Sequence, residues 1–200
     1  MITIANTPKD AARELARRYN VRLSSESLNS LAMLLHSDRY RHRTFVLKAG
    51  EQSNILYFVA KGLIRQYKEI GKDNDDVIQD IVHEGNILFF QQCLLSDTPS
   101  SLNVQTLEPT ILYGAEYSDL KALADTTPDI NQLLYTILEA TIKKQNKHLD
   151  MLDMHPRERY LAFMEDESEI VRRTPLKYVA SYLRMAPETL SRVRNAINRQ

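Results

Sequence analysis

The stretch that decides the fold is the C-terminal run TPLKYVASYLRMAPETLSRVRNAINRQ, residues 174–200. Apolar residues return there at steps of three and four in two successive segments, which predicts two short amphipathic helices. We expect Thr174 to cap the first helix and Pro187 to open the second, since a hydroxyl satisfies free amides at a helix start and proline needs no amide partner there. Two such helices around a tight turn, the second with polar and basic groups outside, form a helix-turn-helix suited to the major groove of DNA.

Charge is distributed unevenly along this formally neutral chain. Residues 171–200 contain seven basic residues and one acid, whereas residues 66–155 contain six basic and fifteen acidic residues. Neutralisation of DNA phosphates requires such a basic end. The alternative interpretation is a surface helical hairpin with solvated arginines, and the charge distribution favours DNA binding over it.

Length and composition indicate a small intracellular protein. With 200 residues, 43% of them hydrophobic, the chain can form one or two domains with a sizeable core. Cys93 is the only cysteine, which excludes an intramolecular disulfide and any cluster that needs several thiolates from one chain. No signal-peptide pattern is present, and no stretch approaches the roughly 18–20 apolar residues of a membrane span. We therefore expect a cytoplasmic protein with no membrane partner.

Upstream of the C-terminal run the hydrophobic pattern changes twice. Residues 9–18 and 25–36 have helical periodicity, and from about Tyr40 the pattern becomes that of short strands. The expected strands are 44–47, 55–60, 62–68, 77–82, 87–90, 102–107 and 110–116, with polar turns at 48–51 and 71–74. Many short strands at this spacing indicate a sandwich or a barrel-like roll.

A long helix is predicted from Pro128 to Met154. Its near-heptad stripe consists of Ile130, Leu134, Ile137, Thr141, His148 and Leu152. One interpretation is a helix packed on its own domain. The other is a seam covered by a second copy, which would also supply the two-fold symmetry of a two-half-site operator. We favour the homodimer, because the helix links the strands to the C-terminal helices.

This order of parts resembles the Crp/Fnr (cyclic-AMP receptor protein) superfamily of bacterial transcription regulators over nearly the whole chain. ILYFVAKGLIRQYK at 55–68 is similar to the central hairpin of its β-roll, with Gly62 at the turn, and PETLSR at 187–192 is similar to its recognition-helix motif. The resemblance implies an α+β fold in three parts. These are a cyclic-nucleotide-binding-like β-roll sensor domain at 1–127, a dimerisation helix at 128–154, and a (winged) helix-turn-helix at 155–200 with a short or absent wing.

The resemblance also assigns the DNA contacts. It makes Glu188 and Arg192 the base-reading residues, which is chemically sound because arginine can donate to guanine and glutamate can accept from cytosine. The other expected DNA-binding residues are Thr189, Ser191, Arg194 and Lys177.

Three residues depart from the family pattern in this motif. Pro187 stands where many relatives place a base-reading side chain, and Ala186 is a poor N-cap that costs about 1 kcal/mol of helix stability. Arg184 occupies a turn position often held by glycine, where a positive φ would be strained.

The effector site departs further from the family. Cyclic-nucleotide binders there hold the ribose through a Gly-Glu pair and the cyclic phosphate through an arginine followed by serine or threonine. Here Phe89-Phe90 and Ser100-Ser101 stand at those positions, and no arginine occurs between Arg65 and Arg157. A buried phosphate without a guanidinium would be poorly compensated. We therefore predict that the sensor domain does not bind cyclic AMP tightly.

What occupies the sensor pocket is left open by the sequence. The two phenylalanines favour either a different ligand or a pocket packed shut, and Lys144 is either a substitute cation or a solvated surface lysine. The candidate ligand-binding residues are Gly85, Phe89, Phe90, Ser100, Ser101 and Lys144.

No cofactor, metal site or enzymatic activity is predicted. The five histidines never fall two to a strand, and neither a nucleophile elbow nor a phosphate-cradling glycine loop occurs. The sequence thus predicts a homodimeric DNA-binding transcription regulator, with double-stranded DNA, a second copy, RNA polymerase and an unknown small-molecule effector as its partners. The alternative is a ligand-binding or protein-interaction dimer with a degenerate DNA-binding domain.

Overall fold

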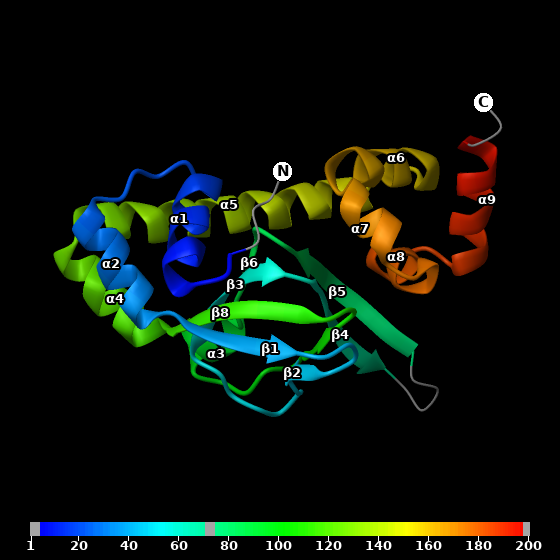
Figure 1. The fold of residues 1–200 in the computed structure, drawn as a ribbon. Coiled ribbons are helices and arrows are strands. Elements are labelled where there is room, and N and C mark those ends of the chain that lie inside the picture. The colour runs from blue at the N-terminus through cyan, green and yellow to red at the C-terminus, as the bar shows by residue number, and fades with distance from the viewer. Residues whose placement is uncertain (1–4, 71–74, 198–200) are drawn as a thin grey trace.

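The computed structural model describes residues 5–70 and 75–197, which form an α+β fold (Figure 1). Two four-stranded antiparallel sheets pack face to face, and helices cover their outer faces. None of the helices in these two stretches is long and apolar enough to cross a membrane. The predicted fold class is confirmed.

The N-terminal helices form as predicted because their caps are encoded locally. Helix α1 (Pro8–Arg18) begins after Thr7, whose hydroxyl accepts from the amide of Asp10 at 3.1 Å. Helix α2 (Ser25–Leu34) begins after Ser24 and ends two residues earlier than predicted, because the backbone turns extended at Leu35. The next five residues form β1 (His36–Tyr40), a polar edge strand that the hydrophobic pattern did not indicate.

All seven predicted strands are confirmed, six of them with shifted ends. They are β2 (Phe45–Leu47), β3 (Ile55–Lys61), β4 (Leu63–Ile70), β5 (Asp75–His83), β6 (Ile87–Leu88), β7 (Asn103–Thr106) and β8 (Thr110–Glu116). One sheet has the order β1-β8-β3-β6 and the other β2-β7-β4-β5. The segment after β6 becomes helix α3 (Gln91–Ser96) rather than a longer strand. The predicted turn at 71–74 lies outside the described residues.

Gly62 joins β3 to β4 at a position that only glycine can occupy. Its φ is +113°, and a Cβ there would lie 2.8 Å from the Cα of Thr110. The predicted hairpin at this residue is wrong, because β3 and β4 lie in different sheets and do not pair; at Gly62 the chain passes from one sheet to the other.

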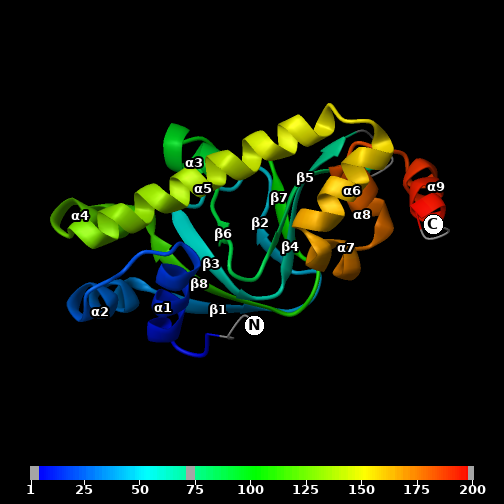
Figure 2. The same cartoon turned by 90° about the horizontal axis from the view of Figure 1, so that it is seen from above.

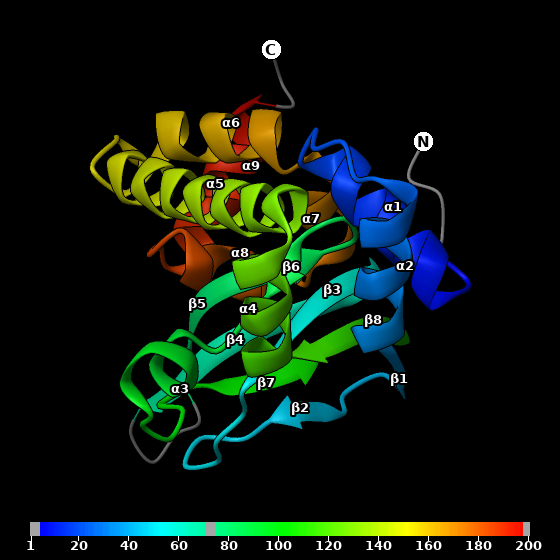
Figure 3. The ribbon, with the colours of Figure 1, turned by 90° about the vertical axis from the view of Figure 1, so that its left-hand side faces the viewer.

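Three apolar clusters hold the layers together. The first lies between the two sheets and includes Val59, Ile64, Val104 and Leu112, all 0% exposed. The second packs the outer face of β3 and β8 against α1, α2, α4 (Tyr117–Thr126) and the first half of α5 (Pro128–Leu152). Figure 3 shows α1 and α2 on one side of the sheets and α3 at the opposite edge.

The third cluster joins the C-terminal helices to the other sheet. These helices are α6 (Pro156–Asp166), α7 (Ser168–Arg173), α8 (Leu176–Tyr182) and α9 (Pro187–Ile197). Leu63, Tyr67, Ile78 and Ile81 of β4 and β5 share a core with them. Seen from above, α5 runs across the sheets from α4 to this group (Figure 2). The C-terminal helices are thus packed on β4 and β5 through a common apolar core.

The residues predicted to form the exposed seam of α5 are wrong, because several of them pack against the chain itself. Ile130 and Ile137 are buried against the chain's own sheet, and His148 stacks on Tyr182 of α8 with 4.2 Å between ring centres. A different stripe, shifted by one residue and therefore by about 100° around the helix, is left exposed. It consists of Tyr135, Leu138, Ile142 and Leu149.

The predicted cap at Thr174 is also wrong. Thr174 ends α7, and α8 begins only at Leu176 because Pro175 adopts an extended ψ of 136°. The Thr174 hydroxyl is buried without a hydrogen-bond partner among the described residues. The start of α9 at Pro187 agrees with the prediction.

Candidate functional site

The turn between α8 and α9 has a defined backbone geometry. Arg184 has a φ of +49°, and the amide of Met185 donates to the carbonyl of Ala180 at 2.9 Å while that of Arg184 donates to Ser181 at 3.0 Å. This pair of bonds is a Schellman motif, which usually places glycine at the left-handed position. Arg159 of α6 donates to the carbonyl of Leu183 at 2.7 Å and secures the same helix end. The positive φ expected at Arg184 is confirmed.

Helix α9 exposes one face and buries another. Leu190 is 0% exposed, and Val193 and Ile197 pack against the C-terminal core. Glu188 and Arg192 are exposed four residues apart on the outer side, at the end of the molecule farthest from α2 (Figure 1). The structure thus brings the two predicted base-reading residues onto one accessible face.

The other predicted DNA contacts lie around this face. Thr189, Ser191 and Arg194 are half-buried on α9, and Lys177 is exposed on α8 with its ammonium 4.9 Å from the ring centre of Tyr178. Across residues 5–70 and 75–197, no carboxylate forms an ion pair with Arg192, Arg194 or Lys177. These cations keep their charge available for a ligand.

Two basic residues of the C-terminal run are paired with carboxylates of the chain itself, Arg172 on the surface and Arg173 half-buried. Arg172 pairs with Glu169 at 2.7 Å, and Arg173 pairs with Glu84 at 2.7 Å and also with Glu108. Burial raises the pKa of Glu84, but the hydrogen bonds from Arg173 and the amide of Gly62 outweigh it and leave the pKa lowered. The net positive charge of the run therefore overstates what DNA could contact.

The first helix of the pair, α8, is attached to the second sheet. The Ser181 hydroxyl accepts from the amide of Ile78 and donates to the carbonyl of Asp76, both at 2.9 Å. The guanidinium of Arg65 lies 3.9 Å from the ring centre of Tyr67 and 4.3 Å from that of Tyr178. Nothing in the sequence pattern signalled the contacts of Ser181 and Tyr178 with the sheet, because α8 and these strands lie far apart in the chain.

A cavity of about 600 Å³ opens between the sheets, α1 and α5. Phe89, Phe90, Ser100, Ser101 and Lys144, five of the six predicted ligand-binding residues, line it. The sixth, Gly85, does not line the cavity, although its neighbour Asn86 does. The Lys144 ammonium lies 3.0 Å from Asp80 of β5.

In the loop that carries Ser100 and Ser101, both backbone amides and the Ser100 hydroxyl already donate hydrogen bonds within the chain. The Ser100 hydroxyl donates to the carbonyl of Leu102 at 2.9 Å, and the Ser100 amide donates to Glu51 at 2.8 Å. The Ser101 amide donates to the side chain of Gln92, also at 2.8 Å. Phe90 is 4% exposed in the core between the sheets. This part of the cavity offers neither a free amide cradle nor a guanidinium.

The charged wall of the cavity was only partly predicted. Burial lowers the pKa of Lys144, but Asp80 and Glu167 outweigh it and leave that pKa raised. Glu167 in turn lies 3.1 Å from the ring nitrogen of His83. Arg18, at the end of α1, also lines the cavity. Sequence reasoning missed it because no spacing relates α1 to α5.

Metal chemistry finds no support in the described part of the chain. No group of three or more His, Cys, Asp or Glu residues there is arranged to hold an ion. Cys93 is 8% exposed, and its thiol lies 4.0 Å from the carbonyl of Glu51.

Comparison with known proteins agrees with this geometry. Residues 37–127 match the family model of the cyclic nucleotide-binding domain. FixK2 from Bradyrhizobium japonicum shares 20% identity, with 83% of this chain and 85% of that chain covered and a TM-score of 0.67. CLP, the c-di-GMP responsive global regulator of Xanthomonas campestris, shares 18% identity over 88% and 92% of the two chains, with a TM-score of 0.66.

A third solved structure extends the likeness. The Thermus thermophilus catabolite activator protein shares 19% identity, with 91% of this chain and 87% of that chain covered and a TM-score of 0.53. No curated protein matches the sequence. Residues 37–127 are therefore similar to cyclic nucleotide-binding domains, and the chain shares its fold with these solved structures of Crp/Fnr-family regulators.

Proposed function

We propose that this protein is a homodimeric transcription regulator of the Crp/Fnr type that binds DNA through α9. The observation that carries the proposal is the outer face of α9, where Glu188 and Arg192 are exposed and Arg192 has no ion-pair partner among the described residues. The buried Leu190 and the hydrogen-bonded turn at Arg184 hold this face rigidly. A rigid helix with a free guanidinium and a free carboxylate can read guanine and cytosine edges.

The surrounding groups suit the DNA backbone. Lys177 and Arg194 supply positive charge on either side of the base-reading pair, and the hydroxyls of Thr189 and Ser191 can donate to phosphates. In this proposal residues 155–200 are the DNA-binding domain. A regulator of this kind would act in the cytoplasm and would have RNA polymerase as a partner.

A second copy of the chain would cover the exposed stripe of α5. Tyr135, Leu138, Ile142 and Leu149 are spaced three, four and seven residues apart and are between 49% and 63% exposed. That spacing is the heptad pattern of a coiled coil. A two-fold dimer through residues 128–154 would present two α9 helices to successive major grooves, about 34 Å apart.

Residues 1–127 would act as a sensor domain that does not bind cyclic AMP tightly. The loop at Ser100 and Ser101 supports this part of the proposal, because its two amides and the Ser100 hydroxyl already donate to Glu51, Gln92 and Leu102. A cyclic phosphate placed there would have to break these bonds without gaining a guanidinium in exchange.

The test is selection of duplexes from a random DNA pool, followed by fluorescence anisotropy with the selected sequence. We expect affinity to fall steeply with salt. Arg192→Ala should weaken binding about ten- to a hundredfold and relax the preference at one base pair, since one bidentate contact discriminates by about 1–3 kcal/mol. Arg22→Ala, at an exposed position of the N-terminal region, is the matched control and should change affinity less than about twofold.

The alternative makes a different prediction for the same experiment. If no sequence is enriched, or if Arg192→Ala and Arg22→Ala behave alike, the C-terminal helices do not read DNA. The protein would then be a ligand-binding or protein-interaction dimer with a degenerate DNA-binding domain.

A further inference from the structure

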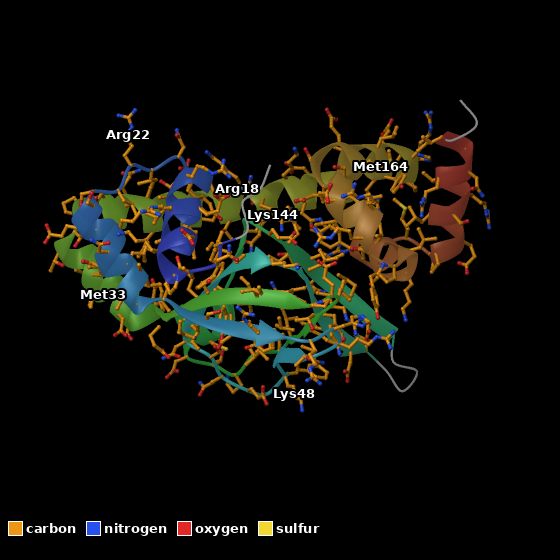
Figure 4. All side chains as sticks on the ribbon, viewed as in Figure 1. Arg18, Arg22, Met33, Lys48, Lys144 and Met164 are labelled. Atoms are coloured by element: carbon orange, nitrogen blue, oxygen red, sulfur yellow. The ribbon has the colours of Figure 1, made fainter. Side chains whose placement is uncertain are left out.

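Arg18 brings to the cavity a guanidinium that has no carboxylate partner among the described residues. Among residues 5–70 and 75–197, its guanidinium donates only to the Asn86 side chain, at a long 3.5 Å, and its Nε would lie 3.7 Å from a Cβ on Gly85. Figure 4 shows Arg18 of α1 and Lys144 of α5 close together, whereas Arg22 points away from the molecule. Arg18 and Lys144 line the same cavity.

The wall of the cavity carries more positively than negatively charged side chains. Arg18, Lys68 and Lys144 line the cavity together with two carboxylates, Asp80 and Glu167. Asp80 is engaged by Lys144 at 3.0 Å and Glu167 by His83 at 3.1 Å. The positive charge of Arg18 acts to lower the pKa of Lys144, although the net effect of all neighbours is to raise it. The two cations therefore repel one another across the cavity. An anion placed between them would relieve this repulsion.

The remaining wall is suited to a small organic molecule. Tyr19, Ile87, Phe89 and Phe90 add apolar surface to the cationic side. A volume of about 600 Å³ lies within the usual range for ligand sites in proteins. Phe89 is only half-buried, so its ring can still pack against a planar group.

We propose that this cavity binds a small organic anion whose phosphate or carboxylate group lies between the Arg18 guanidinium and the Lys144 ammonium, with its planar part against Phe89. The anion would thus be held from α1 and α5, not from the loop at Ser100 and Ser101. Only the regulatory meaning of this site rests on the proposed function, because ligand binding itself needs no DNA.

Ligand binding at this site would affect how the C-terminal helices pack on β5. A ligand that binds Lys144 competes with Asp80 of β5, the strand whose Ile78 amide donates to Ser181 of α8. Glu167, which precedes α7, also lines the cavity. The ligand therefore contacts the sheet, α5 and the C-terminal helices at once.

The test is calorimetric titration of the full chain with two pairs of compounds. Each pair differs mainly in its anionic group: 5′-AMP against adenosine, and indole-3-acetate against tryptophol. We expect at least one anion to bind and its neutral partner to bind much more weakly, and the better anion tells phosphate from carboxylate. Arg18→Gln and Lys144→Gln should each raise the dissociation constant about tenfold or more, because each removes a charge-assisted hydrogen bond.

Arg22→Gln and Lys143→Gln are the matched controls, since both are exposed residues that do not line the cavity. They should change the dissociation constant less than about twofold. Circular dichroism melting curves verify that all four variants fold. If neither anion binds at millimolar concentration, or if Arg18→Gln and Arg22→Gln weaken binding equally, the proposal is wrong. Cyclic AMP binding that Arg18→Gln leaves unchanged would also overturn it. None of these outcomes alters the Arg192 experiment, so the two proposals fail separately.

Discussion

The two apolar stripes of α5 differ by one position in the sequence, yet the chain itself covers only one of them. Ile130, Leu133 and Ile137 are at most 4% exposed, whereas Leu138 and Ile142 are both 49% exposed. The inward stripe completes the core on β3 and β8. The outward stripe has no such sheet to pack against, and it keeps a heptad spacing that suits a second helix. One helix can thus serve both an internal core and an external partner.

The inward side of α5 is apolar in its first half and polar in its second half. The second half carries Thr141 and Lys144 into the cavity and His148 onto Tyr182. The helix leaves the N-terminal core at this point and meets the C-terminal helices. Thr141 and Lys144 on the second half of this side therefore form part of the cavity wall.

The largest effect expected along α5 comes from the inward stripe. Ile137→Ala should lower the free energy of unfolding by about 3 kcal/mol, because it leaves a cavity in a packed core. Urea denaturation should show this loss at every protein concentration. Leu138→Ala, one residue away, should lower the stability only at concentrations where a second copy binds. Equal, concentration-independent losses for both variants would remove the distinction between the stripes.

The second effect concerns the outward stripe. Ile142→Glu should raise the dimer dissociation constant about a hundredfold or more, because two like charges would face each other across a desolvated seam. Sedimentation velocity measures this constant. Lys143→Gln, on the adjoining exposed face, should leave it nearly unchanged. A wild-type protein that sediments as a monomer at high concentration would contradict the dimer.

The smallest expected effect is a pH dependence of the free energy of unfolding, and it comes from His148 at the polar end of the inward side of α5. Burial lowers the pKa of His148, with Arg184 and Lys144 acting in the same direction and Asp80 against it. In the unfolded chain His148 is protonated near pH 6.5, whereas in the folded chain it is protonated only at lower pH. The free energy of unfolding therefore falls as the pH drops below about 6.5. The lowered pKa values of Glu84 and Glu167 matter only below their usual value of 4.5.

His148→Phe isolates this contribution. The phenyl ring can still stack on Tyr182, and it removes a ring nitrogen that is buried without a hydrogen bond. Urea denaturation at pH 7.5 and 5.5 should show a smaller loss of stability for the variant than for the wild type. The same loss in both proteins would mean that His148 does not resist protonation.

Local patterns predicted most elements, and they failed where tertiary contacts decide. The strands and α5 follow from periodicities of 2 and 3.6 residues, which act within one segment. Strand β1 was missed because HSDRY has no apolar alternation and pairs only with β8 at the edge of its sheet. Thr174 looked like a cap by residue type, but its hydroxyl is buried where α7 ends.

The sequence by itself determined the order of the parts, the two short C-terminal helices around a tight turn, and the face of α9 that carries Glu188 and Arg192. These features depend on residues a few positions apart, whose relative placement a single helix or hairpin sets. Only the tertiary structure decided which stripe of α5 is covered, that Arg173 is held by Glu84 and Glu108, and that Arg18 and Lys144 line one cavity. Those contacts join segments far apart in the chain, and their geometry exists only once the sheets and helices have packed.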